Sequence, residues 1–231
     1  MDYFIISLLF IPVLIFTIIA SVKVNTTFKK YNKVSSARGL TGAQAAQRVL
    51  YANGITDVTI NQIAGNLSDH YNPADNSLNL SADVYNGTSV AAIGVACHEA
   101  GHAMQYAHSY LPIKIRSAII PITNFGAKFS GLLIMGGILF ASFGFTPLLF
   151  LAEIGLVLFG FSTVFQLVTL PTEFNASRRA IQCINESNIL LPSEIKGAKK
   201  VLRAAAMTYV AALAVSLLEL LRLISIVKGR D

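Results

Sequence analysis

Long apolar runs separate polar stretches along this chain, and several of these runs are long enough to cross a lipid bilayer. The first occupies residues 3–22 and contains no charged side chain. A transmembrane helix needs about 20 consecutive apolar residues, so this run predicts a membrane anchor. A cleaved signal peptide is the alternative. However, no basic segment precedes the run, and it exceeds the usual apolar length of about 7–15 residues.

A second apolar region, residues 126–170, is too long for one span. Its middle, "GFTPLL" at 144–149, contains a glycine and a proline that favour a tight turn. The region therefore predicts a transmembrane hairpin with helices at about 125–144 and 148–170. A fourth span is predicted at about 204–227.

The basic residues indicate how the predicted spans are oriented. Most of the chain's 18 lysines and arginines lie in the segments after the first and third spans, and the hairpin tip has none. The positive-inside rule places both segments in the cytoplasm. Glu153, Glu219 and Arg222 lie inside predicted spans, which makes a transporter one hypothesis. Glu219 and Arg222 are also spaced to pair on one helix face.

The spans divide the chain into five expected parts: an N-terminal anchor (1–22), a small domain (23–117), the transmembrane hairpin (118–170), a cytoplasmic segment (171–203), and a C-terminal span with its tail (204–231). Composition agrees with a membrane protein, because 54% of the residues are apolar and only 13% are charged. The net charge of +6 is not gathered into a basic stripe with aromatic residues, so nucleic-acid binding is not expected. The two cysteines match no metal or disulfide spacing and are interpreted as small buried apolar residues.

The small domain at 23–117 carries patterns of both helix and strand. A helix with a capping box at its start is predicted at 41–54. Alternating residues predict short strands at 57–63 and 77–81, and the intervening stretch 68–76 is rich in turn residues. The fold class is therefore an α-helical membrane protein of about four transmembrane helices, with a small α+β domain at the cytoplasmic face.

An almost entirely apolar helix is predicted at 89–107, and a helix that is apolar on every face should be buried. The strand at 77–81 is expected to be an edge strand beside this helix. A substrate peptide could then pair with that edge by strand addition, which would make backbone contacts dominate recognition.

The chemistry of this helix lies in "HEAGH", which begins at His98. Residues four apart on a helix lie one above the other, so His98 and His102 can bind one zinc ion. Glu99 projects beside such an ion, where it can act as the general base towards a zinc-activated water. Gly101 lets another backbone or a substrate approach closely. A buried pair of structural histidines is the alternative, but burying them without a partner is costly.

A catalytic zinc site needs a third protein ligand and one open position. Glu173, in "LPTEFNASRRA", follows the third predicted span on the cytoplasmic side. The hairpin returns the chain to the membrane face of the 89–107 helix, so topology selects Glu173 as this ligand. Pro171 is compatible with the first turn of a new helix there. His108 lies about 80° around the helix from His98, and a structural or surface role is expected for it.

Four motifs of the chain closely resemble those of the YugP-type bacterial membrane zinc metallopeptidases, also known as neutral zinc metallopeptidases: "HEAGHAMQ", "SDHYNP", "NLS" and "LPTEFNASRRA". The likeness extends from Gly39 to the last span. More distantly, the chain is similar to the HtpX and CAAX prenyl protease gluzincins. The resemblance implies that His98, His102 and Glu173 are zinc ligands and that Glu99 is the catalytic base.

The sequence leaves two site roles open: the group that orients a zinc histidine and the group that stabilises the oxyanion. The distant relatives have an aspartate where this chain has Ser177; that aspartate orients a zinc histidine, so either Ser177 or Asp69 is a candidate for the role. His70 or Tyr71, within the "SDHYNP" stretch, could stabilise the oxyanion, although a simple turn is an equal interpretation. Arg178 competes for that role, with topology signal or lipid anchor as its alternatives.

The sequence thus predicts a zinc metalloendopeptidase in the bacterial cell membrane, with its active site facing the cytoplasm and peptides or membrane proteins as substrates. The alternative is a membrane scaffold or chaperone with a structural or vestigial zinc site. A structural zinc site normally has four protein ligands, and only three good candidates are found here.

Overall fold

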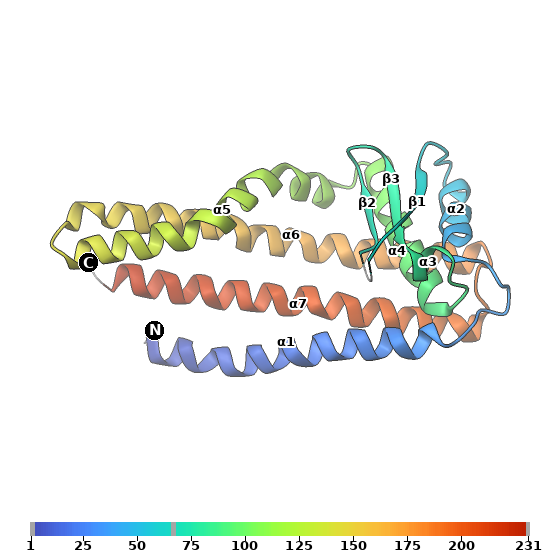
Figure 1. Cartoon of the computed structure of the whole chain (residues 1–231), viewed down its shortest axis with the longest axis horizontal. Coiled ribbons are helices and arrows are strands. Elements are labelled where there is room, and N and C mark those ends of the chain that lie inside the picture. The colour runs from blue at the N-terminus through green and yellow to red at the C-terminus, as the bar shows by residue number, and fades with distance from the viewer. Residues whose placement is uncertain (1–2, 66–67, 230–231) are drawn as a thin grey trace. The chain divides into compact units, whose positions relative to one another are not determined.

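A computed structural model describes residues 3–65 and 68–229, with side chains at the N-terminus described from Ser7 onward. Four long helices dominate it: α1 (Tyr3–Asn32), α5 (Leu111–Ser142), α6 (Phe150–Glu186) and α7 (Pro192–Lys228). Within the described residues, these four are the helices long and apolar enough to cross a membrane. The prediction of about four membrane-spanning helices with a small α+β part is confirmed, since a three-stranded sheet accompanies the four candidate spans (Figure 1).

The helices extend beyond the apolar runs that predicted them. Helix α6 continues through Pro171 to Glu186, so the expectation that a new helix starts at Pro171 is wrong. A proline inside a helix removes one backbone hydrogen bond, but the turns on both sides keep theirs. Prolines also lie within α1, at Pro12, and within α5, at Pro121. Single prolines in long apolar helices therefore do not mark ends in this chain.

The chain separates into two compact units. Unit 1 comprises the N-terminal part of α1, residues 114–170 and the C-terminal part of α7; unit 2 comprises Ala20–Ile113 and Pro171–Thr208. In unit 1, α5 and α6 form the predicted hairpin, joined by the 3-10 turn η1 (Thr146–Leu149). Gly144 has a φ of +93°, which explains the glycine at this turn. Arg222 and Glu219 form the predicted pair within α7.

Unit 2 contains a sheet of β1 (Thr59–Ile63), β2 (His70–Asn72) and β3 (Ser77–Ser81), in the order β1-β3-β2. β3 pairs parallel with β1 and antiparallel with β2. The prediction that 77–81 is an edge strand is therefore wrong, because its backbone is paired on both sides and every residue in it is buried. The turn-rich stretch also proves to contain strand β2, which forms one edge of the sheet.

Helices α3 (Ala82–Tyr85) and α4 (Val90–Ala107) pack against this sheet, and α2 (Gly42–Ala52) packs against α4. Helix α2 begins with the predicted capping box at Thr41, and Ser89 caps α4 by accepting from the N–H of Ala92. Figure 1 shows α4 running alongside the three strands, and the buried core of unit 2 includes residues from all of these elements. The apolar helix predicted at 89–107 is thus an internal helix of unit 2.

Candidate metal centre

Three side chains from two helices of unit 2 converge on one point. His98 and His102 come from α4 and Glu173 from α6, and their potential ligand atoms all lie within 4.8 Å of one another. The Nε2 atoms of His98 and His102 lie 3.2 and 3.5 Å from the same carboxylate oxygen, Oε2 of Glu173. All three side chains are largely buried. The arrangement brings together the residues that spacing and topology selected.

The close approach of α4 and α6 depends on Gly101. A Cβ added at this position would lie 2.6 Å from the carbonyl oxygen of Ala176, far inside van der Waals contact. Ala176 lies on α6, less than one turn beyond Glu173, and is fully buried. The glycine between the two histidines therefore allows the backbone contact that carries Glu173 to them, as its position in the motif suggested.

Each histidine is oriented through its second ring nitrogen. Nδ1 of His98 lies 3.1 Å from the hydroxyl of Ser177, and Nδ1 of His102 lies 3.0 Å from Oε1 of Gln105. Since the amide oxygen of Gln105 only accepts, Nδ1 of His102 carries the proton. Nε2 is then the ring nitrogen of His102 that faces Glu173. Two such imidazoles and a carboxylate are a donor set that fits zinc and leaves a fourth position open.

Gln105 is a site residue that sequence reasoning missed. Its side chain is completely buried, and its Nε2 donates to the carbonyl oxygen of Thr172 at 2.8 Å and to Oδ1 of Asn175 at 3.0 Å. Both acceptors lie on α6, so Gln105 connects the orientation of His102 to that helix. The available signal was a polar residue three positions after His102 on an otherwise apolar helix.

Glu99 lies next to the cluster and is held by strand β2. Its Oε2 accepts a hydrogen bond from the backbone N–H of Tyr71 at 3.2 Å. Burial raises the pKa of Glu99 above its ordinary value, while the charges of His102 and His98 oppose that increase. The backbone of β2 thus fixes one carboxylate oxygen of Glu99. Glu99 itself lies on the same turn of α4 as the two histidines.

The side chains of "SDHYNP" are engaged within the sheet. The Tyr71 hydroxyl donates to Oδ1 of Asn76, and burial raises the pKa of the Tyr71 phenol. His70 is exposed, and its Nδ1 lies 2.8 Å from the carbonyl oxygen of Ser68. Asp69, the alternative orienting group, accepts from the backbone N–H and the hydroxyl of Ser81. In the described part of the chain, the hydrogen bonds of these three side chains go to the sheet and its neighbouring loops rather than to the ring nitrogens of the cluster.

Two further candidates lie on other surfaces of unit 2. Arg178 is exposed and lines a pocket between α6 and α7. His108 ends α4, and its Nδ1 accepts from the guanidinium of Arg179 at 2.8 Å. The structural role expected of His108 agrees with this contact.

Comparison with known proteins gives the family. The family model described as "Putative neutral zinc metallopeptidase" matches residues 6–228. The chain belongs to this family. It is also 46% identical over 213 residues to the "Putative membrane protease YugP" of Bacillus subtilis (strain 168), which covers 92% of each chain. No solved structure matches the chain. Zinc is the cofactor that membership in this family gives, and the cluster of His98, His102 and Glu173 is a group that could hold it.

Proposed function

We propose that this chain is a membrane zinc endopeptidase in which His98, His102 and Glu173 hold the metal and Glu99 is the general base. The observation that carries the proposal is the convergence of the three donors, with both Nδ1 atoms engaged by Ser177 and Gln105. Three protein ligands leave the open position that a catalytic site needs. The family description and the name of the relative support zinc and peptidase chemistry.

Each residue of the site has a separate role in the proposed hydrolysis. When bound, zinc would polarise the scissile carbonyl and lower the pKa of a water molecule at the open position. The Glu99 carboxylate would take a proton from the attacking water and would return a proton to the amine as the C–N bond breaks. The N–H of Tyr71 fixes one oxygen of Glu99, so the other oxygen is available for the proton. Ser177 and Gln105 keep the two imidazoles aimed at Glu173.

The substrates on this proposal are peptides and membrane or membrane-proximal proteins, cleaved at the cytoplasmic face of the bacterial cell membrane. Most lysines and arginines lie in the segments after the first and third predicted spans, and this excess supports the cytoplasmic orientation. Single cysteines introduced at exposed positions 38 and 51 should resist a membrane-impermeant maleimide in intact cells and react after lysis. Labelling of either position from outside intact cells would overturn the orientation.

The decisive variant is Glu99→Gln, which keeps the size of the side chain but removes the base. We expect normal zinc content by metal analysis, with cleavage of fluorescein-labelled casein falling by about 10²–10⁴-fold. His102→Ala is the matched control and should lose zinc as well as activity. Wild-type activity in Glu99→Gln would overturn the assignment.

The same two variants separate the proposal from its rival, a scaffold or chaperone with a structural zinc site. In a scaffold, His102→Ala would lower the melting temperature of the protein strongly, and Glu99→Gln would change nothing measurable.

A further inference from the structure

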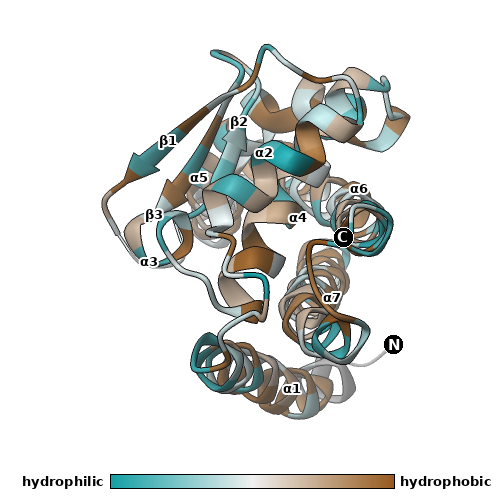
Figure 2. Ribbon diagram, turned by 90° about the vertical axis from the view of Figure 1, so that its right-hand side faces the viewer, coloured by the Kyte–Doolittle hydropathy of each residue, from teal (hydrophilic) through white to brown (hydrophobic). Residues whose placement is uncertain are grey.

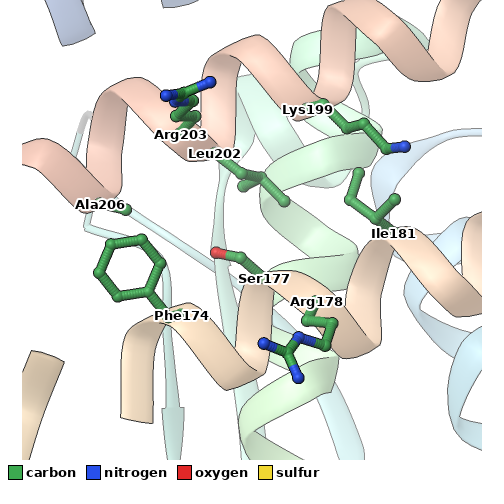
Figure 3. A pocket seen from close by; sticks show the side chains of 8 residues that line it. All are labelled: Phe174, Ser177, Arg178, Ile181, Lys199, Leu202, Arg203 and Ala206. Atoms are coloured by element: carbon green, nitrogen blue, oxygen red, sulfur yellow. The ribbon is translucent and has the colours of Figure 1, made fainter. Parts of the chain in front are cut away.

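A pocket of about 620 Å³ lies between α6 and α7 in unit 2 (Figure 3). Each helix lines it with one stripe of residues at positions i, i+3, i+4 and i+7, starting at Phe174 on α6 and at Lys199 on α7. None of the three candidate metal ligands is among the residues that line it. The pocket therefore lies outside the three candidate ligands, although it shares Ser177 with their surroundings.

The charges in this pocket all have one sign. Arg178, Lys199 and Arg203 line it, and no acidic side chain does. In the part of the chain that the structure describes, none of these three forms an ion pair with a carboxylate. Figure 3 shows their cationic groups at separate points around the pocket, with Ser177 and Leu202 between them. Two guanidinium groups and one ammonium group, with no acidic side chain among the lining residues, favour an anionic group such as a phosphate.

The apolar part of the lining adjoins the predicted membrane spans. Phe174, which is 43% exposed, follows the third predicted span by about one helical turn. Ala206 lies just inside the fourth predicted span, 204–227. Lysine and arginine at the end of a span lie at the depth of the lipid headgroups, where apolar neighbours contact the acyl region. The pocket thus combines a cationic lining with an aromatic side chain at that depth.

We propose that this pocket binds the anionic headgroup of a phospholipid. The phosphate contacts Arg178, Lys199 and Arg203, and the start of an acyl chain covers Phe174. An acidic peptide could satisfy the same charges, but it would leave the exposed aromatic ring next to the span uncovered. Ser177 lines the pocket and also contacts Nδ1 of His98, so a bound headgroup lies beside a residue of the metal centre.

The chain contains no tryptophan, which provides a direct test. Phe174→Trp places a single indole in the pocket of the full chain, reconstituted in phosphatidylcholine vesicles that contain a minor share of brominated lipid. We expect brominated phosphatidylglycerol to quench this tryptophan with at least about a fivefold higher relative binding constant than brominated phosphatidylcholine. Native mass spectrometry of the unsubstituted chain from equimolar mixed micelles makes the same comparison without the reporter.

Two charge-matched double variants on α7 separate the pocket from general electrostatics. Lys199→Gln with Arg203→Gln should reduce the preference for phosphatidylglycerol to less than about twofold, because it removes charges inside the pocket. Lys196→Gln with Lys200→Gln removes two positive charges from the same helix but outside the pocket, and should leave the preference unchanged.

Three results would overturn the proposal. The first is equal quenching by the two brominated lipids together with equal retention in mass spectrometry. The second is an equal loss of preference in both double variants. The third is release of quenching by millimolar tetraglutamate or inorganic phosphate as effectively as by unbrominated phosphatidylglycerol, which would assign the pocket to acidic peptides or to free anions.

Discussion

Helices α1 and α4 are both apolar on nearly every face, yet they meet opposite surroundings. Many apolar side chains of α1 are exposed, as Ile15 is at 52%, and Figure 2 shows many brown, apolar residues on this helix beside teal, polar ones. In α4 the apolar side chains are buried, as Ile93 is at 0%, against the core of unit 2. The same composition therefore serves a helix whose apolar surface lipid can cover and a helix that protein already covers.

The polar residues of the two helices differ in the same way. Thr17 of α1 satisfies its hydroxyl within its own helix, by donating to the carbonyl oxygen of Val13. The polar residues of α4 instead have partners on other elements: Gln105 bonds to α6, Glu99 to β2, and His98 to Ser177 of α6. A buried polar side chain is costly unless it is paired, so the paired polar residues inside the apolar α4 mark a site.

The largest difference between the two helices should appear when the same side chain is shortened in each. Ile93→Ala leaves a cavity in a closed core and should lower the free energy of unfolding by about 2–5 kcal/mol. Ile15→Ala loses only contact with detergent or lipid and should cost less than about 1 kcal/mol. Thermal denaturation of the purified full chain in detergent measures both. Equal costs would mean that α1 is packed against protein as tightly as α4.

Glycines offer a second, smaller contrast. Gly101→Ala forces a methyl group against the carbonyl of Ala176 and should destabilise the protein by about 1–3 kcal/mol, with weaker zinc binding as α6 moves away. Gly131→Ala on α5 meets no atom within 4 Å and should be neutral or stabilising by up to about 1 kcal/mol, because alanine favours helix. A melting curve for each variant and a zinc titration give the result. A neutral Gly101→Ala would contradict the close approach of the two helices.

Removing Gln105, the hydrogen-bond partner of His102, should lower zinc affinity more than it lowers the stability of the fold. Gln105→Ala leaves the imidazole without its acceptor, and zinc affinity should fall by about 10–100-fold. The exposed Gln47, which bonds to Tyr51 on α2, is the control, and Gln47→Ala should leave zinc affinity unchanged. Competition with a chromophoric chelator measures both. An unchanged affinity in Gln105→Ala would remove Gln105 from the site.

The smallest effect is expected at Ser177. Ser177→Ala removes one hydroxyl beside Nδ1 of His98, and zinc affinity should fall by no more than about tenfold. His98 is partly exposed, so water can replace the lost hydroxyl, whereas the side chain of Gln105 is fully buried. The same chelator competition applies. A loss larger than that of Gln105→Ala would reverse the ranking of the two orienting residues.

Local features of this molecule follow closely from the sequence. The presence of four apolar spans, the turn at Gly144, the capping box at Thr41 and the helical spacing of His98 and His102 depend on neighbours a few residues away. The strand at 77–81 was predicted with its observed bounds for the same reason. Its place in the centre of the sheet was not, because strand order depends on pairing with β1 and β2 from either side.

The sequence by itself determined a four-helix membrane protein and one buried helix with its histidines four residues apart, since hydrophobic periodicity and helical geometry act over single turns. Only the tertiary structure decided how those histidines are held. Ser177 reaches His98, and α6 holds the side chain of Gln105, because α4 and α6 approach closely at Gly101. Contacts between residues this far apart in the chain leave no local pattern to find. The cationic pocket between α6 and α7 has the same origin, because its two stripes become one surface only when the helices pack together.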